Sequence, residues 1–400
     1  MENYTSIGMD SYDEERGEVY KIPINSEIYK IYYKNGYIFY PNHFLNKNKN
    51  EYNQKEQQNN YSSYKIDNIR PCGLHNIGGV CYLNATLQCF FYCRPLTEFF
   101  LNLYDKKNLG PISKGYFDFI KRLSSGDKDA AQNFKKAMIK MDNIFYGTDG
   151  NDSKDVAVLI LSELQNELKQ NKNDEIIKLD RKVNNFDLND VYKERMELDR
   201  INGNSTIISK TFNFFMKYKQ QCRGCGIKCE KFSKPYYTIE IDNLLILDLE
   251  TLFPHDNIKI SVEDILKSYT SPKKMECPYC KTKSLYIQNK FCVLPKILIL
   301  VISRGFHNKF KCQIKFDETL DIYDYYESID SDDYNNTEYS LIGATFAYDW
   351  SYKGTGHTVA FCKTYQNDDY YVFNDRSIRK TQINEIYGKL PYLLFYERKS

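Results

Sequence analysis

A cysteine near the start of the globular part of the chain has surroundings suited to nucleophilic catalysis. Cys81 follows the glycine pair Gly78 and Gly79 in the segment NIGGVCYLNATLQC (76–89). Glycine adopts backbone conformations closed to other residues, so the pair predicts a tight turn directly before Cys81. If a helix begins there, its unpaired amides and its dipole favour the thiolate over the thiol. Taken alone, the segment is equally compatible with a buried structural cysteine, because free cysteine is often found in protein cores.

A cysteine nucleophile needs a base, and the base needs a group that orients it. Among the five histidines, His357 stands where the glycines of GTGHTVAF lead into a predicted strand, and YYVFND follows as the next strand. If the two strands form a hairpin with its turn near Gln366, the residue numbers of each facing pair sum to about 731. Asn374 then lies opposite His357, and directly facing residues have Cβ atoms roughly 4.5–5.5 Å apart. The asparagine can then orient the imidazole, as in a Cys-His-Asn triad. The alternative is a hairpin with an exposed histidine and an ordinary Asn-Asp turn.

Attack on a carbonyl creates an oxyanion, which needs hydrogen-bond donors. Asn76 stands five residues before Cys81. Its side-chain amide could be presented on the same turn as the backbone N–H of Cys81, and it is therefore a candidate oxyanion donor. The alternative is an asparagine that only forms the turn, which is a common role.

Two C-x-x-C pairs form a second constellation that could do chemistry. CRGC contributes Cys222 and Cys225, and CPYC contributes Cys277 and Cys280. Four thiolates match the tetrahedral coordination of zinc and leave no open position for substrate, so a structural ion is predicted. The alternatives are a redox-active pair and an unrelated group of cysteines, and Cys229 is a candidate spare ligand.

Helices are expected to position the first of these groups. Apolar residues recur at helical spacing within residues 83–101, which predicts an amphipathic helix directly after Cys81. Cys89 and Cys93 fall inside this pattern and are expected in the core. Residues 112–170 look mainly helical, with two glycine breaks.

Strands dominate the later part of the chain. FSKPYYTIEI (232–241) ends as a strand, and FCVLPKILILVIS (291–303) is predicted as a buried strand. From residue 339 onward four strands follow one another: YSLIGATFAY, HTVAFCK, YYVFND and YLLFYER. Helices first and antiparallel strands later predict the α+β class.

The bulk composition excludes several classes of protein. The chain has 400 residues, with 55 Lys plus Arg against 53 Asp plus Glu, which argues against a protein built to grip nucleic acid. No apolar run reaches the roughly 18 residues of a membrane span, and the acidic N-terminal segment has no secretory pattern. Twelve cysteines without an export signal predict a reducing compartment, cytoplasm or nucleus, where cysteine clusters favour metal binding or catalysis over disulfides.

The N-terminal part of the chain differs from the rest in composition and in its pattern of apolar residues. Residues 46–63 are polar and low in complexity, which predicts a disordered linker. The segment EVYKIPINSEIYKIYYKNGYIFY before it alternates apolar and polar residues and could form a few short strands. We therefore expect an N-terminal extension over residues 1–63 and one catalytic domain over residues 64–400.

Several of these segments together resemble the ubiquitin-specific proteases, a family of papain-like deubiquitinases. GLHNIGGVCYLNATLQ is similar to the cysteine box of that family, and GTGHTVAF with YYVFND is similar to its histidine box. PYLLFYER resembles its closing strand, and the C-x-x-C pairs resemble its zinc ribbon. DSKDVAVLILSEL (152–164) is similar to a helical box whose aspartate contacts the ubiquitin tail. The resemblance covers about residues 68–398, with the motifs in the family's order.

The resemblance implies a hand-shaped fold. A helical thumb would occupy about residues 70–200, zinc-bearing fingers about 205–300 and a β-rich palm about 290–400. The site residues it implies are the nucleophile Cys81, the base His357, the third member Asn374 with the adjacent acid Asp375, the oxyanion donor Asn76, the tail contact Asp155, and the zinc ligands Cys222, Cys225, Cys277 and Cys280. The implied partners are ubiquitin and ubiquitinated proteins, with neither nucleic acid nor membrane among them.

The chain departs from the family pattern beside the site. Gly79 and Val80 stand where Asn-Thr is frequent, and Thr358 replaces a frequent aromatic residue. In the helical box, Ser153, Lys154 and Val158 replace two glutamines and a glutamate. An active thiol isopeptidase is the function that the intact triad favours. A ubiquitin-binding module without turnover, a protease for a ubiquitin-like modifier, and a thiol oxidoreductase using Cys222 and Cys225 stay open as alternatives.

Overall fold

In the computed structural model, part of the chain is described residue by residue. The described residues are 29–34, 37–39, 66–103, 108–141, 145, 152–169, 196, 205–225, 236–253, 259–305, 310, 312–328, 336–347, 357–386 and 389–399. Backbone alone is described for 29–34, 37–39, 236 and 238. The predicted linker over residues 46–63 and the candidate ligand Cys229 lie outside these residues. None of the described helices is long and apolar enough to cross a bilayer.

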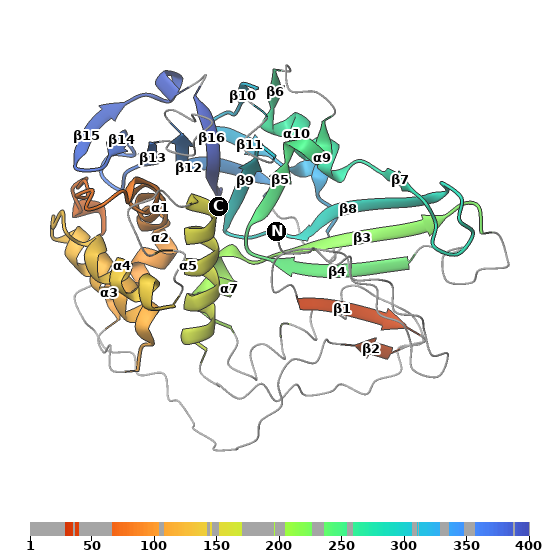
Figure 1. Cartoon of the computed structure of the whole chain (residues 1–400), viewed down its shortest axis with the longest axis horizontal. Coiled ribbons are helices and arrows are strands. Elements are labelled where there is room, and N and C mark those ends of the chain that lie inside the picture. Colours follow the sequence, from red (N-terminus) through yellow and green to blue (C-terminus); the bar gives the residue numbers. More distant parts are fainter. Residues whose placement is uncertain are drawn as a thin grey trace.

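Helices gather on one side of the molecule, in a group that we call the helical lobe (Figure 1). It comprises α1 (Cys81–Phe91), α2 (Arg94–Asn102), α3 (Pro111–Ser124), α4 (Ala131–Met141), α5 (Ser153–Glu167) and α7 (Ile207–Phe212). The single helix predicted within residues 83–101 is two helices, because the chain turns at Tyr92 and Cys93. Pro95 sits in the first turn of α2, where its missing N–H costs no hydrogen bond. Cys89 and Cys93 are fully buried, as predicted.

The late strands form an eight-stranded sheet against which the helical lobe packs. Its path runs β15-β14-β13-β12-β16-β9-β5, with β11 paired to β12. The strands are β5 (Leu245–Asp248), β9 (Ile297–Ser303), β11 (Thr319–Asp321), β12 (Glu338–Ala347), β13 (Thr358–Lys363), β14 (Tyr370–Asn374), β15 (Ser377–Thr381) and β16 (Leu390–Arg398). The predicted α+β class is confirmed, and β15 is a strand that the sequence pattern did not reveal.

The run of apolar residues in β9 has a structural reason, because both faces of this strand are buried. Ile297, Ile299 and Val301 face the core of the helical lobe. Leu298, Leu300 and Ile302 face a second core, which α9 (Leu249–Leu252) and α10 (Val262–Thr270) help to cover. A strand buried on both faces reads as a continuous apolar segment rather than an alternating one. The segment predicted as one strand over 291–303 is nevertheless broken between Val293 and Ile297, around Pro295, which cannot donate to a ladder.

A second, six-stranded sheet extends away from the first, and its long strands β3, β4 and β8 reach to the far end of the molecule (Figure 1). It consists of β1 (Tyr29–Lys34), β2 (Tyr37–Phe39), β3 (Phe214–Cys222), β4 (Tyr236–Asp242), β7 (Lys273–Met275) and β8 (Leu285–Val293). The N-terminal strands that the alternating pattern suggested are therefore present, and β1 pairs with the edge of β4.

Short elements complete the fold. A parallel pair joins two two-residue strands, β6 (Ile260–Ser261) and β10 (Ile314–Lys315). The described residues also include the 3-10 turns η1 (Ile66–Asn68), η5 (Tyr323–Tyr325) and η6 (Ile383–Ile386).

Candidate active site

Cys81 is the first residue of α1, as the glycine pair and the apolar pattern predicted. Gly78 and Gly79 have φ angles of 77° and 66°, in the left-handed region that glycine adopts without strain. The helix start leaves the first amides of α1 without partners inside the helix. The thiol of Cys81 therefore lies at the positive end of the helix dipole, with the residue 8% exposed.

His357 directly precedes β13, and its ring is held by the next strand. Its Nε2 lies 2.6 Å from Oδ1 of Asn374, the last residue of β14. With the Nε2 N–H donated to this oxygen, Nδ1 is the ring nitrogen that remains to exchange a proton. The His357 side chain is 38% exposed, so a substrate can reach it.

The hairpin register differs from the predicted one by two residues. Ala360 pairs with Phe373, so the residue numbers of facing pairs sum to 733 and not to 731. The prediction that His357 lies directly opposite Asn374 was therefore wrong. The turn is centred later because Asn367 and Asp368 take its left-handed positions. A shift of two keeps each side chain on its face of the sheet. His357 and Asn374 become diagonal neighbours, which lie within reach of long side chains.

Asp375 occupies the turn between β14 and β15 and has a φ of 50°. A residue that continued the strand would point to the opposite face from Asn374, but β14 ends at Asn374. The carboxylate of Asp375 therefore accepts hydrogen bonds from the side-chain amides of Asn76, at 3.0 Å, and Asn84, at 2.8 Å. The same carboxylate lies 4.0 Å from Nε2 of His357. Asp375 thus ties helix α1 and the loop before it to the hairpin that carries the histidine.

Asn76 is fixed at both ends of its amide. Its Oδ1 accepts from the backbone N–H of Val80 at 2.9 Å, and its Nδ2 donates to Asp375. The Nδ2 group carries two hydrogens, and the bond to Asp375 uses one of them. The residue is exposed, so the second hydrogen can meet an incoming oxyanion.

Asp155 lies in the first turn of α5, which is capped by Asp152. Its carboxylate pairs with Lys154 Nζ at 3.4 Å. Tyr392 donates to Asp152 at 2.7 Å. Burial, followed by the charge of Asp152 and the bond to it, raises the pKa of Tyr392, and Asp155 adds a smaller contribution. Asp155 is therefore part of an acidic helix start.

The two C-x-x-C pairs come together near the far end of the six-stranded sheet. The sulfurs of Cys222, Cys225, Cys277 and Cys280 all lie within 4.8 Å of one another. The Cys222–Cys280 and Cys225–Cys277 sulfur separations are 3.6 and 3.4 Å. Metal–sulfur bonds of ~2.3 Å in a tetrahedron place sulfurs about 3.8 Å apart. The donor set therefore fits a metal ion with four thiolate ligands.

Two hydroxyl groups accompany this cysteine cluster. Ser284 Oγ lies 2.9 Å from the Cys222 sulfur, and Thr282 Oγ1 lies 3.0 Å from the Cys280 sulfur. Contacts with Ser284 and Thr282 lower the pKa of Cys280 to about 5. Burial acts to raise the pKa of Cys222, but hydrogen bonds from Ser284 and the Gly224 amide outweigh it, and that pKa is lowered. These contacts favour the thiolate form that a metal ion requires.

Comparison with known families decides the identity of the fold. The family model described as ubiquitin carboxyl-terminal hydrolase matches residues 72–396, which include Cys81 and His357. The chain belongs to the ubiquitin carboxyl-terminal hydrolase family. The predicted resemblance to ubiquitin-specific proteases is thereby confirmed.

Individual relatives within this family are distant in sequence. Ubiquitin carboxyl-terminal hydrolase 16 of Arabidopsis thaliana is 23% identical over 353 residues, which cover 84% of this chain and 31% of that protein. Ubiquitin carboxyl-terminal hydrolase 2 of Bos taurus is 24% identical over 358 residues, which cover 82% of this chain and 55% of that protein. The chain thus spans less than two thirds of the length of these two relatives.

Solved structures support the same fold. The SAGA Ubp8/Sgf11/Sus1/Sgf73 DUB module bound to ubiquitin aldehyde contains a chain that superposes with a TM-score of 0.61 at 18% identity. The match covers 84% of this chain and 71% of that chain. The same module with a substituted Ubp8, bound to monoubiquitin, gives a TM-score of 0.62 at 18% identity, and this match covers 85% of this chain and 72% of that chain.

Two features beside the candidate site were not singled out from the sequence. Asn84 is 2% exposed and joins α1 to Asp375. A polar residue one helical turn after Cys81, within an otherwise apolar pattern, was a signal that could have revealed it. The pairing of His75 with Asp129 gave no such signal, because it joins a loop to residues 54 positions later.

Proposed function

We propose that this chain is a thiol-dependent deubiquitinase that hydrolyses peptide or isopeptide bonds at the C-terminal glycine of ubiquitin. The observation that carries the proposal is the 2.6 Å contact between His357 and Asn374, on a hairpin tied through Asp375 to the helix that begins at Cys81. Membership of the family supports the reaction class. The structures of relatives bound to ubiquitin aldehyde and monoubiquitin support ubiquitin and its conjugates as the substrates.

In the first half of the proposed reaction the bond to the substrate lysine is broken. Nδ1 of His357 takes the thiol proton, and the Cys81 sulfur attacks the carbonyl carbon of the terminal glycine. The negative oxygen that forms is stabilised by the Nδ2 of Asn76 and the backbone N–H of Cys81. The intermediate then collapses, the C–N bond breaks, and the lysine amine leaves with the proton from His357. A thioester joins ubiquitin to Cys81.

In the second half water releases ubiquitin. His357 takes a proton from the water as its oxygen attacks the thioester carbonyl, and the same two donors stabilise the oxyanion. Collapse of this intermediate expels the Cys81 sulfur, which recovers its proton from His357. Asn374 holds the imidazole throughout, so Nδ1 stays directed at the reacting atoms.

Substrate binding is proposed to use the three parts of a hand. The helical lobe would act as the thumb, the eight-stranded sheet as the palm and the six-stranded sheet as the fingers. Asp155 would contact the ubiquitin tail. Cys222, Cys225, Cys277 and Cys280 would hold one structural zinc ion, which stabilises the fingers and takes no part in the chemistry.

The test uses mono-ubiquitin carrying either a C-terminal fluorophore or a C-terminal electrophile. The wild-type chain should release the fluorophore and form a covalent adduct at Cys81. Cys81→Ser and His357→Ala should abolish release while retaining ubiquitin binding. Cleavage at the wild-type rate by either variant would show that the nucleophile or the base is misassigned.

A ubiquitin-binding module without turnover is a second candidate, favoured by one observation. Lys154 pairs with Asp155 at 3.4 Å and partly neutralises the carboxylate that would hold the tail. Binding of mono-ubiquitin without labelling of Cys81 by the electrophilic probe would select this candidate. Probes built on ubiquitin-like modifiers, compared in the same assay, decide whether a relative of ubiquitin is preferred.

We also propose that the protein works in a reducing compartment, the cytoplasm or the nucleus. Within the described part of the chain, eleven cysteines are present and none forms a disulfide. A catalytic thiol and a thiolate metal site both require reduced sulfur. Fractionation of cells that express the tagged chain tests this; recovery mainly in secretory compartments would contradict it.

A further inference from the structure

We propose that His75 is a positioning residue whose contact with Asp129 fixes the loop that carries Asn76. The proposal rests on the proposed deubiquitinase function. It assigns a role in oxyanion stabilisation to a histidine that does not touch the reacting atoms.

The backbone of His75 is anchored on both sides. Its N–H donates to the carbonyl of Lys128, in the connection between α3 and α4, at 2.8 Å. Its carbonyl accepts from the Asn84 amide of α1 at 3.3 Å. The residue therefore joins the loop before Cys81 to two different parts of the helical lobe.

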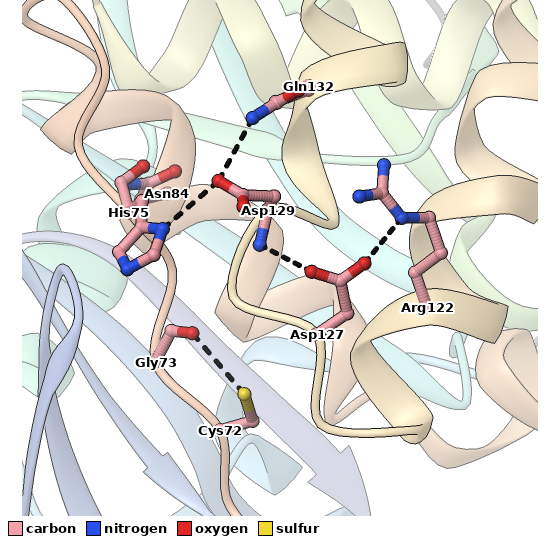
Figure 2. A network of polar contacts seen from close by, with 8 residues as sticks. All are labelled: Cys72, Gly73, His75, Asn84, Arg122, Asp127, Asp129 and Gln132. Atoms are coloured by element: carbon pink, nitrogen blue, oxygen red, sulfur yellow. Dashed lines mark hydrogen bonds and ion pairs between the residues drawn. The ribbon is translucent and has the colours of Figure 1, made fainter.

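The side chain of His75 adds a contact whose partner is itself held rigidly. Figure 2 shows the ring pointing at Asp129, with Nδ1 3.0 Å from Oδ1. The same oxygen of Asp129 accepts from Gln132 at 2.9 Å. The Asp129 backbone N–H donates to Asp127 at 2.8 Å, and Asp127 pairs with Arg122 at 2.7 Å. The pKa of Asp127 is held below its usual range by hydrogen bonds from the Asp129 amide and from Arg122, together with the Arg122 charge. Asp127 therefore stays ionised and keeps its bonds to Asp129 and Arg122.

The loop before Cys81 is thus bonded on two sides, through the neighbouring residues His75 and Asn76. His75 is bonded to Asp129 in the helical lobe, and Asn76 is bonded to Asp375 beside the eight-stranded sheet. Lys135 adds a bond to the carbonyl of Ile77 at 3.2 Å. Loss of the side-chain contact leaves the loop held on the helical side only by the backbone bonds of His75 and by Lys135. The direction of the Asn76 amide toward the developing oxyanion then depends on a loop with two left-handed glycines.

The expected effects on stability and on turnover distinguish a positioning role of His75 from a stabilising one. Both side chains of the His75–Asp129 pair are 40% exposed. Such a pair contributes only about 0–1 kcal/mol to the stability of a fold. A displacement of about 1 Å at a catalytic group, by contrast, can reduce turnover about 10²-fold. A positioning role therefore predicts a loss of kcat that is large relative to any loss of stability.

The experiment compares variants on both sides of the contact, using the full chain and ubiquitin with a C-terminal fluorophore. His75→Ala and Asp129→Ala should each lower kcat by about tenfold to a hundredfold, with KM within about twofold of wild type. The double variant should be no worse than the more affected single variant. Asp67→Ala, which breaks an ion pair between partly exposed side chains with Arg94, is the matched control and should leave kcat unchanged.

Two conservative variants distinguish orientation from mere presence. The Nδ2 of asparagine falls near the position of histidine Nδ1, so His75→Asn should restore most of the lost kcat. Glutamine places its amide near Nε2, and His75→Gln should behave like His75→Ala. Wild-type kcat in both alanine variants overturns the role of His75 and leaves the proposed function standing. A loss of kcat that tracks an equal loss of thermal stability across all variants also overturns it. A wild-type chain that fails to hydrolyse the substrate overturns both proposals.

Discussion

Nε2 of His357 lies 2.6 Å from Oδ1 of Asn374 and 4.0 Å from Oδ2 of Asp375. Only the shorter distance is a hydrogen bond. The two neighbouring residues therefore have different contacts: Asn374 meets the imidazole, and Asp375 meets the amides of Asn76 and Asn84. Because their contacts differ, replacing Asn374 and replacing Asp375 should have different consequences.

Asn374→Ala should reduce kcat and leave the fold intact. Without the amide oxygen the ring of His357 can rotate and lose its proton-transfer geometry, and general acid–base catalysis contributes about 10²–10⁴-fold to a rate. Stability should change little, because Asn374 is exposed at the end of β14. Steady-state kinetics with the fluorogenic ubiquitin substrate and a thermal melt measure the two effects.

Asp375→Ala is the comparison variant for the same assay. It removes the acceptor of two hydrogen bonds, one of them to the buried Asn84, and bonds to charged groups contribute about 1.5–3 kcal/mol each. The free energy of unfolding should therefore fall along with the activity. Full activity in Asn374→Ala together with an inactive but equally stable Asp375→Ala would make Asp375 the partner of His357.

Asn76→Ala should lower kcat by ~10²–10³ and leave KM nearly unchanged, as expected on loss of one preorganised oxyanion donor. Asn84→Ala is the matched variant, since it also removes an amide bonded to Asp375 but lies buried in α1. It should cost more stability and less kcat than Asn76→Ala. An effect of Asn76→Ala confined to KM would mean that the residue binds substrate and does not stabilise the transition state.

The local features of the site followed from the sequence because short-range rules govern them. Gly78 and Gly79 placed the turn, and the apolar pattern placed the start of α1 at Cys81. The hairpin brought His357 and Asn374 near one another, although its turn was placed one residue early. The dipeptide Asn367–Asp368, whose residue types tolerate left-handed backbone, was the signal for the true turn.

The contacts that join separate parts of the chain could not be foreseen. Asp375 binds Asn76 and Asn84 across 299 and 291 residues of sequence. Such contacts depend on how the helical lobe packs on the eight-stranded sheet, and no local propensity encodes that packing. Asp375 also leaves the strand pattern through its positive φ, which redirects its side chain.

Gly73→Ala should disturb the site from outside it. A Cβ at Gly73 would lie 2.6 Å from backbone atoms of Asp375 and Arg376, which cannot rotate away. The turn that carries Asp375 must then shift, and overpacking of this kind costs typically about 1–3 kcal/mol. Gly343→Ala is the control, since its Cβ would meet Cys89 at an ordinary 3.4 Å. Equal melting temperatures and activities for the two variants would show that the close approach at Gly73 is not required.

A pH dependence of stability is expected from Asp242, at the end of β4. Burial and the nearby charge of Glu240 raise the pKa of Asp242, and hydrogen bonds from the Asn243 and Leu244 amides lower it. Burial is the largest effect, and the resulting pKa is about 6. The folded state therefore binds the proton more tightly than the unfolded state, and stability falls as pH rises from about 4 to about 6. Asp242→Asn should remove this loss, adding on the order of 1–3 kcal/mol at pH 7 and nothing below pH 4. Denaturant unfolding at both pH values measures it; a gain of equal size at pH 4 would assign the effect to another cause.

The last prediction concerns the metal. Elemental analysis of the purified protein should find one zinc ion per chain, bound by the cluster of Cys222, Cys225, Cys277 and Cys280. Cys277→Ser should lose the ion, because the cluster then has three thiolates and a weak hydroxyl ligand. Cys292→Ser is the matched control: Cys292 lies in β8 outside the cluster and donates to the carbonyl of Phe215, as serine also can. That variant should keep its metal.

Loss of the ion should loosen one region and spare another. Binding energy at a structural site is partly folding energy, so in Cys277→Ser the segments around residues 222 and 280 should be cut faster by a protease. Ubiquitin affinity should fall, since these segments belong to the proposed fingers. The proposed nucleophile lies on α1 in the helical lobe, so a small electrophile should still modify Cys81 at the wild-type rate. A folded, metal-free wild-type chain with normal activity would contradict the zinc site, and unchanged ubiquitin affinity in metal-free Cys277→Ser would contradict the role of the fingers in binding.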